Sequence, residues 1–246
     1  MYFDLVFHRK ELEDYDLSRC VVVVADVLRA TTVMIRALEN GAMAVFPQAD
    51  EETAQSMYTL LNEQGLPVLL CGEKDGFKRP GYQLGNSPRE YTADMVEGKT
   101  IIHLTTNGTR ALKAASDAHR VFIASFLNMS AVANRLAQYR NEVDTLLFVS
   151  SGRENRYCLE DTVCLGGVIA AYLEPPGEAF EMSDSVRTAL DLYHLYRDRL
   201  LPMVQTCSHG AYLIRVGLEE DLPECVQVNT SNVVPAMKGN RISLQG

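Results

Sequence analysis

Short apolar runs alternate with longer amphipathic stretches along most of this chain. Runs typical of β-strands cover residues 2–7, 21–25, 44–46, 67–71, 100–104, 121–124 and 145–149. Apolar residues at helical spacing predict helices over residues 31–40, 50–64, 108–118, 129–139, 161–172 and 184–199. Strands that alternate with helices are typical of a largely parallel or mixed sheet flanked by helices. The pattern therefore predicts an α/β fold.

The pattern leaves the domain organisation open. A polar stretch near residue 140 favours an N-terminal α/β subdomain, 1–140, and a C-terminal one, 141–246, unless the chain forms one compact domain. Pro47 is expected to end the third strand, and the last twenty residues predict one strand and a mostly irregular end. Residues 72–88 form a loop too long for a plain connection, which favours a functional role for Glu73, Asn86 and Ser87.

Three of the strand runs end in clusters of small polar and charged residues that open a predicted helix. These segments are residues 21–32, 100–112 and 145–155. Ligands of open α/β sheets bind at the carboxyl ends of the strands. Helix starts at the same edge offer unpaired N–H groups and a positive dipole end, which suit an anion. We therefore expect a site for a phosphorylated ligand and a hard metal ion.

The first of these ends carries an aspartate and an arginine. Asp26 follows a buried strand, where a carboxylate needs a hydrogen bond, an ion pair or a bound cation. Arg29 could pair with Asp26 or hold a phosphate or sulfonate with two N–H groups. Thr31 can cap the helix that follows. A purely structural Asp–Arg pair is the alternative.

The other two ends carry anion-binding and acidic groups. Asn107 and Gly108 allow a concave nest of backbone N–H groups, although the same dipeptide can mark only a tight turn. Arg153 supplies charge at the third end. Glu160 and Asp161 begin the next helix, where they could satisfy its dipole or join Asp26 as oxygen ligands of Mg²⁺.

The charge of the chain narrows the choice of ligands. A formal net charge of −9 argues against the basic surface that nucleic-acid binding requires. An anionic ligand then needs a local positive field from arginines, helix ends or a metal. No apolar run approaches the roughly 20 residues that span a bilayer, and the first residues lack a secretory pattern. We expect a cytoplasmic protein with no membrane partner, and six structural cysteines.

The segments ADVLRATT, GE, GNSP, TTNGT, SFLN and SGR, the acidic pair at 160–161 and SHG occur in this order. Together they resemble the 2-phosphosulfolactate phosphatase family, from about residue 20 to residue 240. The resemblance implies an α/β architecture particular to that family. It also implies Mg²⁺-dependent hydrolysis of 2-phospho-3-sulfolactate to 3-sulfolactate and phosphate, a step of coenzyme M biosynthesis.

The resemblance and the strand ends together suggest a role for each candidate residue. We expect the catalytic groups to be Asp26, Arg29, Glu160 and Asp161, and the Mg²⁺ ligands to come from Asp26, Glu73, Glu160 and Asp161. The residues expected to bind the substrate are Thr31, Asn86, Ser87, Thr105, Thr106, Asn107, Gly108, Thr109, Ser125, Asn128, Ser151, Gly152, Arg153 and His209. Ser125 and Asn128 could instead cap a helix, and a lone histidine is more often structural.

Several alternatives stay open. Water positioned by Mg²⁺ is the expected nucleophile, and an aspartyl phosphate on Asp26 is the rival, weakened because Leu28 stands where dehalogenase-type phosphatases carry a second carboxylate. The substrate could be another small phosphorylated hydroxy acid, or the protein could bind such an acid without turnover. A nucleotide-binding transferase of doubly wound type is disfavoured by the missing glycine fingerprint. A homodimer is a further expectation that the sequence leaves open.

Overall fold

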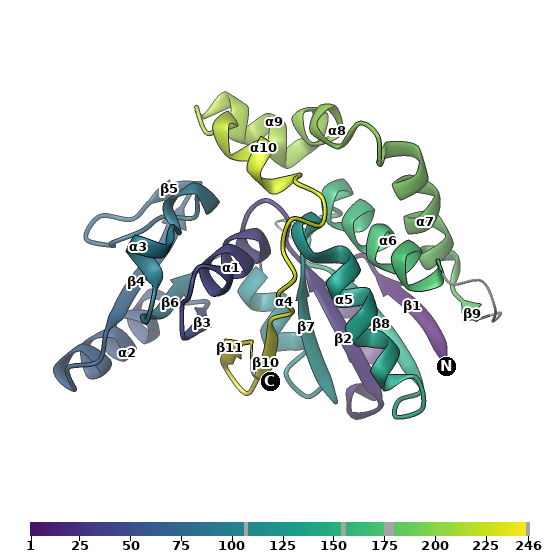
Figure 1. Cartoon of the computed structure of the whole chain (residues 1–246), viewed down its shortest axis with the longest axis horizontal. Coiled ribbons are helices and arrows are strands. Elements are labelled where there is room, and N and C mark those ends of the chain that lie inside the picture. Colours follow the sequence, from purple (N-terminus) through teal and green to yellow (C-terminus); the bar gives the residue numbers. More distant parts are fainter. Residues whose placement is uncertain (106–107, 154–155, 175–179, 245–246) are drawn as a thin grey trace.

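The computed structural model describes residues 1–105, 108–153, 156–174 and 180–244. Within them, one 11-stranded mixed sheet has the strand order β5-β4-β6-β3-β11-β10-β7-β2-β8-β1-β9. The strands are β1 Tyr2–Val6, β2 Cys20–Ala25, β3 Ala44–Gln48, β4 Val68–Lys74, β5 Phe77–Lys78, β6 Thr100–Leu104, β7 Arg120–Ala124, β8 Thr145–Ser150, β9 Glu181–Met182, β10 Ala236–Lys238 and β11 Arg241–Ser243. Helices flank this sheet, which confirms the predicted α/β class (Figure 1).

The α-helices follow the strands in the expected alternation. They are α1 Ala30–Glu39, α2 Glu51–Glu63, α3 Ala93–Val96, α4 Gly108–Ala114, α5 Met129–Leu136, α6 Leu159–Leu173, α7 Asp184–Tyr196, α8 Leu200–Thr206, α9 Ser208–Arg215 and α10 Leu222–Cys225. Short 3-10 turns are η1 Arg9–Asp14, η2 Leu17–Arg19, η3 Pro88–Glu90, η4 Phe126–Asn128, η5 Ala137–Tyr139 and η6 Glu219–Asp221. None of the helices in the described ranges is long and apolar enough to cross a membrane.

A hairpin from the end of the chain joins two parallel groups of strands. Strands β4, β6 and β3 run parallel to one another, as do β7, β2, β8 and β1. Between them lie β10 and β11, which pair antiparallel with β7 and β3 (Figure 1). The sequence predicted only one strand in this tail, because strands of three residues carry too few positions to show a period.

The division into two subdomains near residue 140 stays a prediction. Strand β8, from the second of them, is hydrogen-bonded between β2 and β1 from the first. Strand β3 passes through Pro47 to Gln48, although Pro47 was expected to end it. Strand β11 pairs with β3 only at Val45, so Pro47 has one strand neighbour, where a missing N–H is tolerated.

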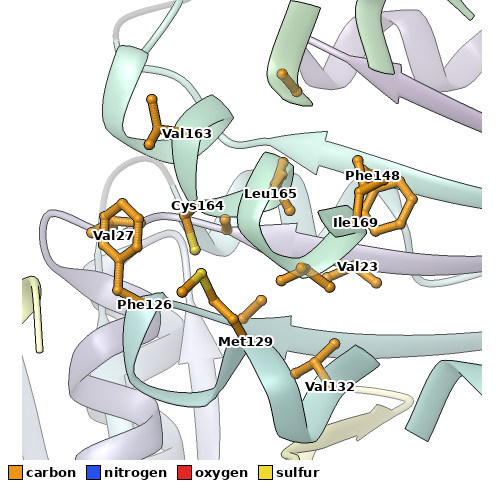
Figure 2. Packing of buried hydrophobic residues seen from close by; sticks show 14 of the residues in the cluster. Val23, Val27, Phe126, Met129, Val132, Phe148, Val163, Cys164, Leu165 and Ile169 are labelled. Carbon is orange, nitrogen blue, oxygen red and sulfur yellow. The ribbon is translucent and has the colours of Figure 1, made fainter. Parts of the chain in front are cut away.

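The run of valines in β2 is continuous because both faces of this strand are covered. Val21 and Val23 belong to the core cluster on the side of α5 and α6, and Val22 and Val24 to the cluster on the side of α1 and α4. Figure 2 shows the first of these clusters, with side chains from β2 and β8 facing those of the two helices: Val23, Phe148, Met129, Val132, Cys164, Leu165 and Ile169. This packing fixes where the ends of the central strands lie.

Candidate active site

A hollow of about 110 Å³ lies where β2, β4 and β6 end, and α9 supplies another part of its wall. We call it the first hollow. Because the carboxyl ends of parallel strands meet at one edge of a sheet, residues far apart in sequence come together there. Its lining residues are Asp26, Leu28, Arg29, Ala30, Glu73, Asp75, Gly76, Asn86, Thr105, Arg153, His209 and Tyr212. Among the predicted site residues it gathers Asp26, Arg29, Glu73, Asn86, Thr105, Arg153 and His209.

Asp26 is the buried carboxylate of the first hollow, with 8 % of its surface exposed. Burial raises the pKa of Asp26 to about 7, and the negative charges of Glu160 and Glu73 add to the rise. Backbone N–H groups of Ala30 and Gly108 donate to the carboxylate and act in the opposite direction. Asp26 therefore lies among other carboxylates at a position where a cation would favour its charged form.

Thr31 fixes the backbone at Asp26 and does not line the first hollow. Its hydroxyl oxygen accepts the N–H of Asp26 at 3.1 Å, and its own N–H donates to the Asp26 carbonyl at 2.9 Å. The hydroxyl of Thr32 donates to the carbonyl of Val27 at 2.9 Å. These bonds close the turn between β2 and α1 and so hold the Asp26 side chain at the strand end.

Asp161 ties together the ends of β2 and β8. Its Oδ1 accepts the N–H of Val27 at 2.9 Å, and its Oδ2 accepts the N–H of Gly152 at 3.3 Å and the hydroxyl of Ser150 at 3.4 Å. Burial, with the charges of Glu160 and Asp26, raises the pKa of Asp161 well above its usual range. Both of its oxygens are used in holding the backbone around the site.

Glu160 lines a second hollow of about 390 Å³, which shares Arg153 and His209 with the first. Burial raises the pKa of Glu160, while hydrogen bonds from the thiols of Cys207 and Cys158 act against the rise. The distance from Glu160 Oε1 to His209 Nδ1 is 3.7 Å. All six cysteines are free and buried, as expected, and these two also support a candidate site residue.

Arg29 pairs with a carboxylate that the sequence did not suggest. Its Nη1 donates to Asp221 Oδ2 at 2.5 Å, and its Nη2 donates to the carbonyl of Gly76 at 2.6 Å. The Ser87 hydroxyl donates to the other oxygen of Asp221 at 2.5 Å. The considered Asp26–Arg29 ion pair is thus replaced by an Arg29–Asp221 pair, and Ser87 supports it from outside the first hollow.

Arg153 and His209 stand between the two hollows. The guanidinium carbon of Arg153 lies 4.1 Å from the centre of the Tyr212 ring, which restricts where its charge can point. Burial lowers the pKa of His209 to about 3, and the charges of Arg153 and Arg29 add to the lowering. His209 is therefore neutral at pH 7, so one ring nitrogen can donate a hydrogen bond and the other can accept one.

The strand end after β6 is described in part. The hydroxyl oxygens of Thr105 and Thr109 lie 2.9 Å apart, and both residues are buried. The N–H of Gly108 donates a hydrogen bond to the Asp26 carboxylate. Thr106 and Asn107 lie outside the described residues, so the proposed anion nest at residues 105–109 stays a prediction.

Comparison with known proteins identifies the family of this chain. Residues 6–240 match the family model described as 2-phosphosulpholactate phosphatase. The chain is 39% identical over 229 residues to a probable 2-phosphosulfolactate phosphatase of Symbiobacterium thermophilum, covering 93% of this chain and 96% of that protein. It is 37% identical over 234 residues to one of Microcystis aeruginosa, covering 95% of each. The chain belongs to the 2-phosphosulfolactate phosphatase family.

One of the motifs that suggested this family, SFLN at residues 125–128, has a structural role here. Ser125 and Asn128 form a capping box around η4, in which the Ser125 N–H donates to Asn128 Oδ1 at 3.0 Å. The amide nitrogen of Asn128 donates to the carbonyls of Ile123 and Val233 at 3.1 and 3.0 Å. Both side chains are fully buried, and neither lines the two hollows. The structure thus shows the helix-capping role, and a role of Ser125 and Asn128 in substrate binding stays a prediction.

The third strand end of this family member divides its predicted residues between two roles. Arg153 lines both hollows, whereas Gly152 donates its N–H to Asp161 and takes a positive φ of 67°. Ser151 is buried, its N–H donates to the Ala25 carbonyl at 2.9 Å, and its hydroxyl has no hydrogen-bond partner among the described residues.

The carboxylates of this family member suit a hard cation by their chemistry. In the described part of the chain, no three His, Cys, Asp or Glu side chains are grouped closely enough to hold a metal ion by themselves. Mg²⁺ usually takes only one or two carboxylates and completes its shell with waters and phosphate oxygens. Asp26, with Glu160 and Glu73 near enough to raise its pKa, fits that kind of site.

Sequence reasoning missed several residues around the first hollow. Asp75, Gly76 and Tyr212 line it, and Asp221 anchors Arg29 from behind. The Tyr212 hydroxyl also donates to the Asp75 carbonyl at 3.0 Å, which joins α9 to the turn after β4. The acidic run at residues 219–221 was the sequence signal for Asp221. It could be interpreted only once its partner, the buried Arg29, was known.

Proposed function

We propose that this protein is a Mg²⁺-dependent phosphatase that hydrolyses 2-phospho-3-sulfolactate to 3-sulfolactate and phosphate. The observation that carries the proposal is the meeting of Asp26 and Glu73 with Arg29 and Arg153 around one hollow, in a chain of this family. A site with carboxylates only would repel a phosphate ester. A site with arginines only could bind the ester, but it would leave the buried carboxylates without a partner. The two sets together suit a cation and an anion that bind side by side.

Asp26 and Glu160, with support from Glu73, would hold the Mg²⁺ ion. When bound, Mg²⁺ supplies positive charge to the phosphoryl oxygens and makes a coordinated water more acidic. The remaining N–H groups of Arg29 and the guanidinium of Arg153 would bind the phosphoryl oxygens and stabilise the charge that spreads over them during transfer.

The reaction breaks the bond between phosphorus and the ester oxygen and forms a bond from water to phosphorus. One proton of the water has to leave, and one proton has to reach the departing alkoxide of the 3-sulfolactate. His209 is neutral and lies in the wall of both hollows, so we assign it to hold or relay this proton through its ring nitrogens. The products are then a free hydroxyl group and hydrogen phosphate.

The proposal is tested by phosphate release from 2-phospho-3-sulfolactate after removal of metal with EDTA and again after Mg²⁺ is added. We expect release only with Mg²⁺, and a loss of about 10³-fold in kcat/KM for Asp26→Asn. Asp117→Asn is the matched control, because this exposed aspartate lies outside both hollows. Equal activity without metal would remove the Mg²⁺ role, and no release from 2-phospho-3-sulfolactate would overturn the proposed substrate.

The same screen should include other phosphorylated hydroxy acids, since the hollows accept any ligand with suitably spaced anionic groups. Faster release from one of these would identify another small phosphorylated acid as the substrate, and tight binding without release would identify a binding protein. A beryllofluoride adduct on Asp26, observed by ¹⁹F NMR, would favour the aspartyl-phosphate route over direct attack by water. A role in coenzyme M biosynthesis, a cytoplasmic location and a homodimer stay predictions.

A further inference from the structure

The acidic 3-10 turn η6, Glu219–Asp221, lies against residues from the first half of the chain. Asp221 is 3 % exposed and pairs with Arg29, which lies 192 positions earlier. On either side of it, Glu220 pairs with Arg89, and Glu224 lies 3.9 Å from Arg36. We call residues 219–224 the acidic strap. Three arginines from distant parts of the sequence thus hold the strap beside the first hollow.

Asp221 and Gly76 together fix the plane of the Arg29 guanidinium. One oxygen of Asp221 accepts from Nη1 at 2.5 Å, and the Gly76 carbonyl accepts from Nη2 at 2.6 Å. The second oxygen of Asp221 accepts the Ser87 hydroxyl at 2.5 Å, which prevents the carboxylate from turning. These contacts use two of the five N–H donors of the guanidinium, and Arg29 lines the first hollow beside Asp26.

Without this anchor the guanidinium would have other carboxylates to pair with. Asp26 and Glu73 line the same hollow and carry the charge that attracts an arginine. An Arg29 side chain that turned toward them would occupy the place of the phosphate and neutralise the groups proposed to hold the cation. Asp221 keeps Arg29 apart from both carboxylates and leaves its orientation set before a ligand arrives.

We propose that Asp221 is a positioning residue for Arg29, itself held in place by the Ser87 hydroxyl. The inference rests on the proposed function for its kinetic consequence, but the orientation of Arg29 can be observed without any substrate. Ser87, expected from the sequence to bind the substrate, acts in this arrangement through Asp221.

The direct test is the ¹⁵N NMR signal of the Arg29 guanidinium, assigned by its absence from an Arg29→Lys variant. In the wild-type protein we expect a resolved Nε–H signal that exchanges slowly, because both Nη groups are held. In Asp221→Asn this signal should broaden or move, and in Glu220→Gln it should stay unchanged. An unchanged Arg29 signal in Asp221→Asn would overturn the proposal, whatever the protein hydrolyses.

The kinetic test uses Mg²⁺-dependent release of phosphate from 2-phospho-3-sulfolactate. We expect Asp221→Asn to lower kcat/KM by about 10²-fold, the loss typical of a catalytic group misplaced by about 1 Å. Glu220→Gln, which removes a neighbouring strap carboxylate that does not contact Arg29, should stay within about twofold of the wild type. In an Arg29→Gln background, Asp221→Asn should cause no further loss, since a positioning residue has no effect once its target is gone.

Ser87→Ala guards against a fold that fails when Asp221 is changed. This variant removes one hydroxyl and leaves the ion pair, so we expect a folded protein with kcat/KM lowered several-fold and a shifted Arg29 signal. Full activity with an unchanged signal would show that Asp221 needs no support from Ser87. An equal further loss from Asp221→Asn in the presence and absence of Arg29 would assign Asp221 a merely structural role. Failure of the wild type to release phosphate would refute the proposed function, while the NMR comparison would still decide the role of Asp221.

Discussion

Gly108, the first residue of α4, has no side chain, and this leaves room for the Asp26 carboxylate. Changing Gly108 to alanine therefore perturbs the position of this carboxylate directly. An ideal Cβ at this position would lie 2.8 Å from Asp26 Oδ2 and 3.0 Å from the Cβ of Ala30. Ordinary contact begins at 3.4 Å, so the carboxylate oxygen would have to move by about 0.6 Å. The N–H of Gly108 also donates a hydrogen bond to this carboxylate. Moving the carboxylate would therefore disturb this hydrogen bond as well.

The expected loss follows from this displacement. A misplacement of about 1 Å costs about 10²-fold in rate, so 0.6 Å should lower kcat/KM of Gly108→Ala by about 10-fold. The apparent affinity for Mg²⁺ should fall as well, because Asp26 is the proposed ligand. The free energy of unfolding should change by no more than about 2 kcal/mol, since crowding destabilises the variant while alanine favours the helix.

Phosphate release as a function of Mg²⁺ concentration measures both effects. The control is the double variant Ala30→Gly with Gly108→Ala, which removes the contact between the two Cβ atoms and keeps the contact with Asp26. If the carboxylate is the cause, the double variant should be no more active than Gly108→Ala. Full activity of Gly108→Ala, or its recovery on the change at Ala30, would refute the reasoning.

Two further predictions concern groups next to the site. Burial, with the charge of Arg29, lowers the pKa of His103 to about 3. Its ring makes a T-shaped contact with Tyr91, and neither ring nitrogen has a hydrogen-bond partner among the described residues. Because the folded state holds the pKa of His103 below the ordinary value of 6.5, the unfolded state binds a proton more readily. The neutral ring is therefore fully compatible with folding above pH 6.5, and the free energy of unfolding falls as the pH drops below that value. Between pH 7 and pH 4.5, the wild type should therefore lose about 2 to 3 kcal/mol of its free energy of unfolding relative to the His103→Leu variant, as measured by chemical unfolding. A difference that stays constant over this pH range would contradict the prediction. Arg153→Met should raise KM for the phosphate ester by about 10-fold, because it removes the positive charge. Tyr212→Phe keeps the ring against Arg153 and should change KM little. If the two variants changed KM equally, the charge of Arg153 would have no role in binding.

The central strands and the residues directly after them could be predicted from the sequence. A strand covered on both faces must be apolar throughout, so β2, β6 and β8 stand out as runs, and their ends mark the sheet edge where ligands bind. Asp26 and Arg153, which line the first hollow, were predicted in this way. Ser125 and Asn128 follow β7 in the same manner, and their capping role shows that a polar cluster after a strand fits a helix cap as well as a ligand.

The C-terminal third was not predictable to the same degree, for a physical reason. Tyr212 lines the first hollow, and Asp221 reaches Arg29 behind it, only because α9 and η6 pack across the strand ends. No local sequence pattern encodes that placement. The hairpin of β10 and β11 likewise depends on strands β7 and β3 that precede it by more than a hundred residues. When tertiary packing decides which residues meet, the sequence shows only that a charged or aromatic residue is present. It does not show which residue this one contacts.

The Arg29–Asp221 pair changes where the positive field for an anion can come from. Paired with Asp221, Arg29 adds donors of fixed direction to the first hollow and little net charge. When ionised, Asp26, Glu73 and Glu160 make the surroundings negative, and Arg153 alone does not offset three carboxylates. A phosphate ester would be repelled from such a site unless a cation neutralised these groups first. The proposed hydrolase should therefore bind Mg²⁺ and phosphate together, each at least several-fold more tightly in the presence of the other, by the reciprocity that links two binding events.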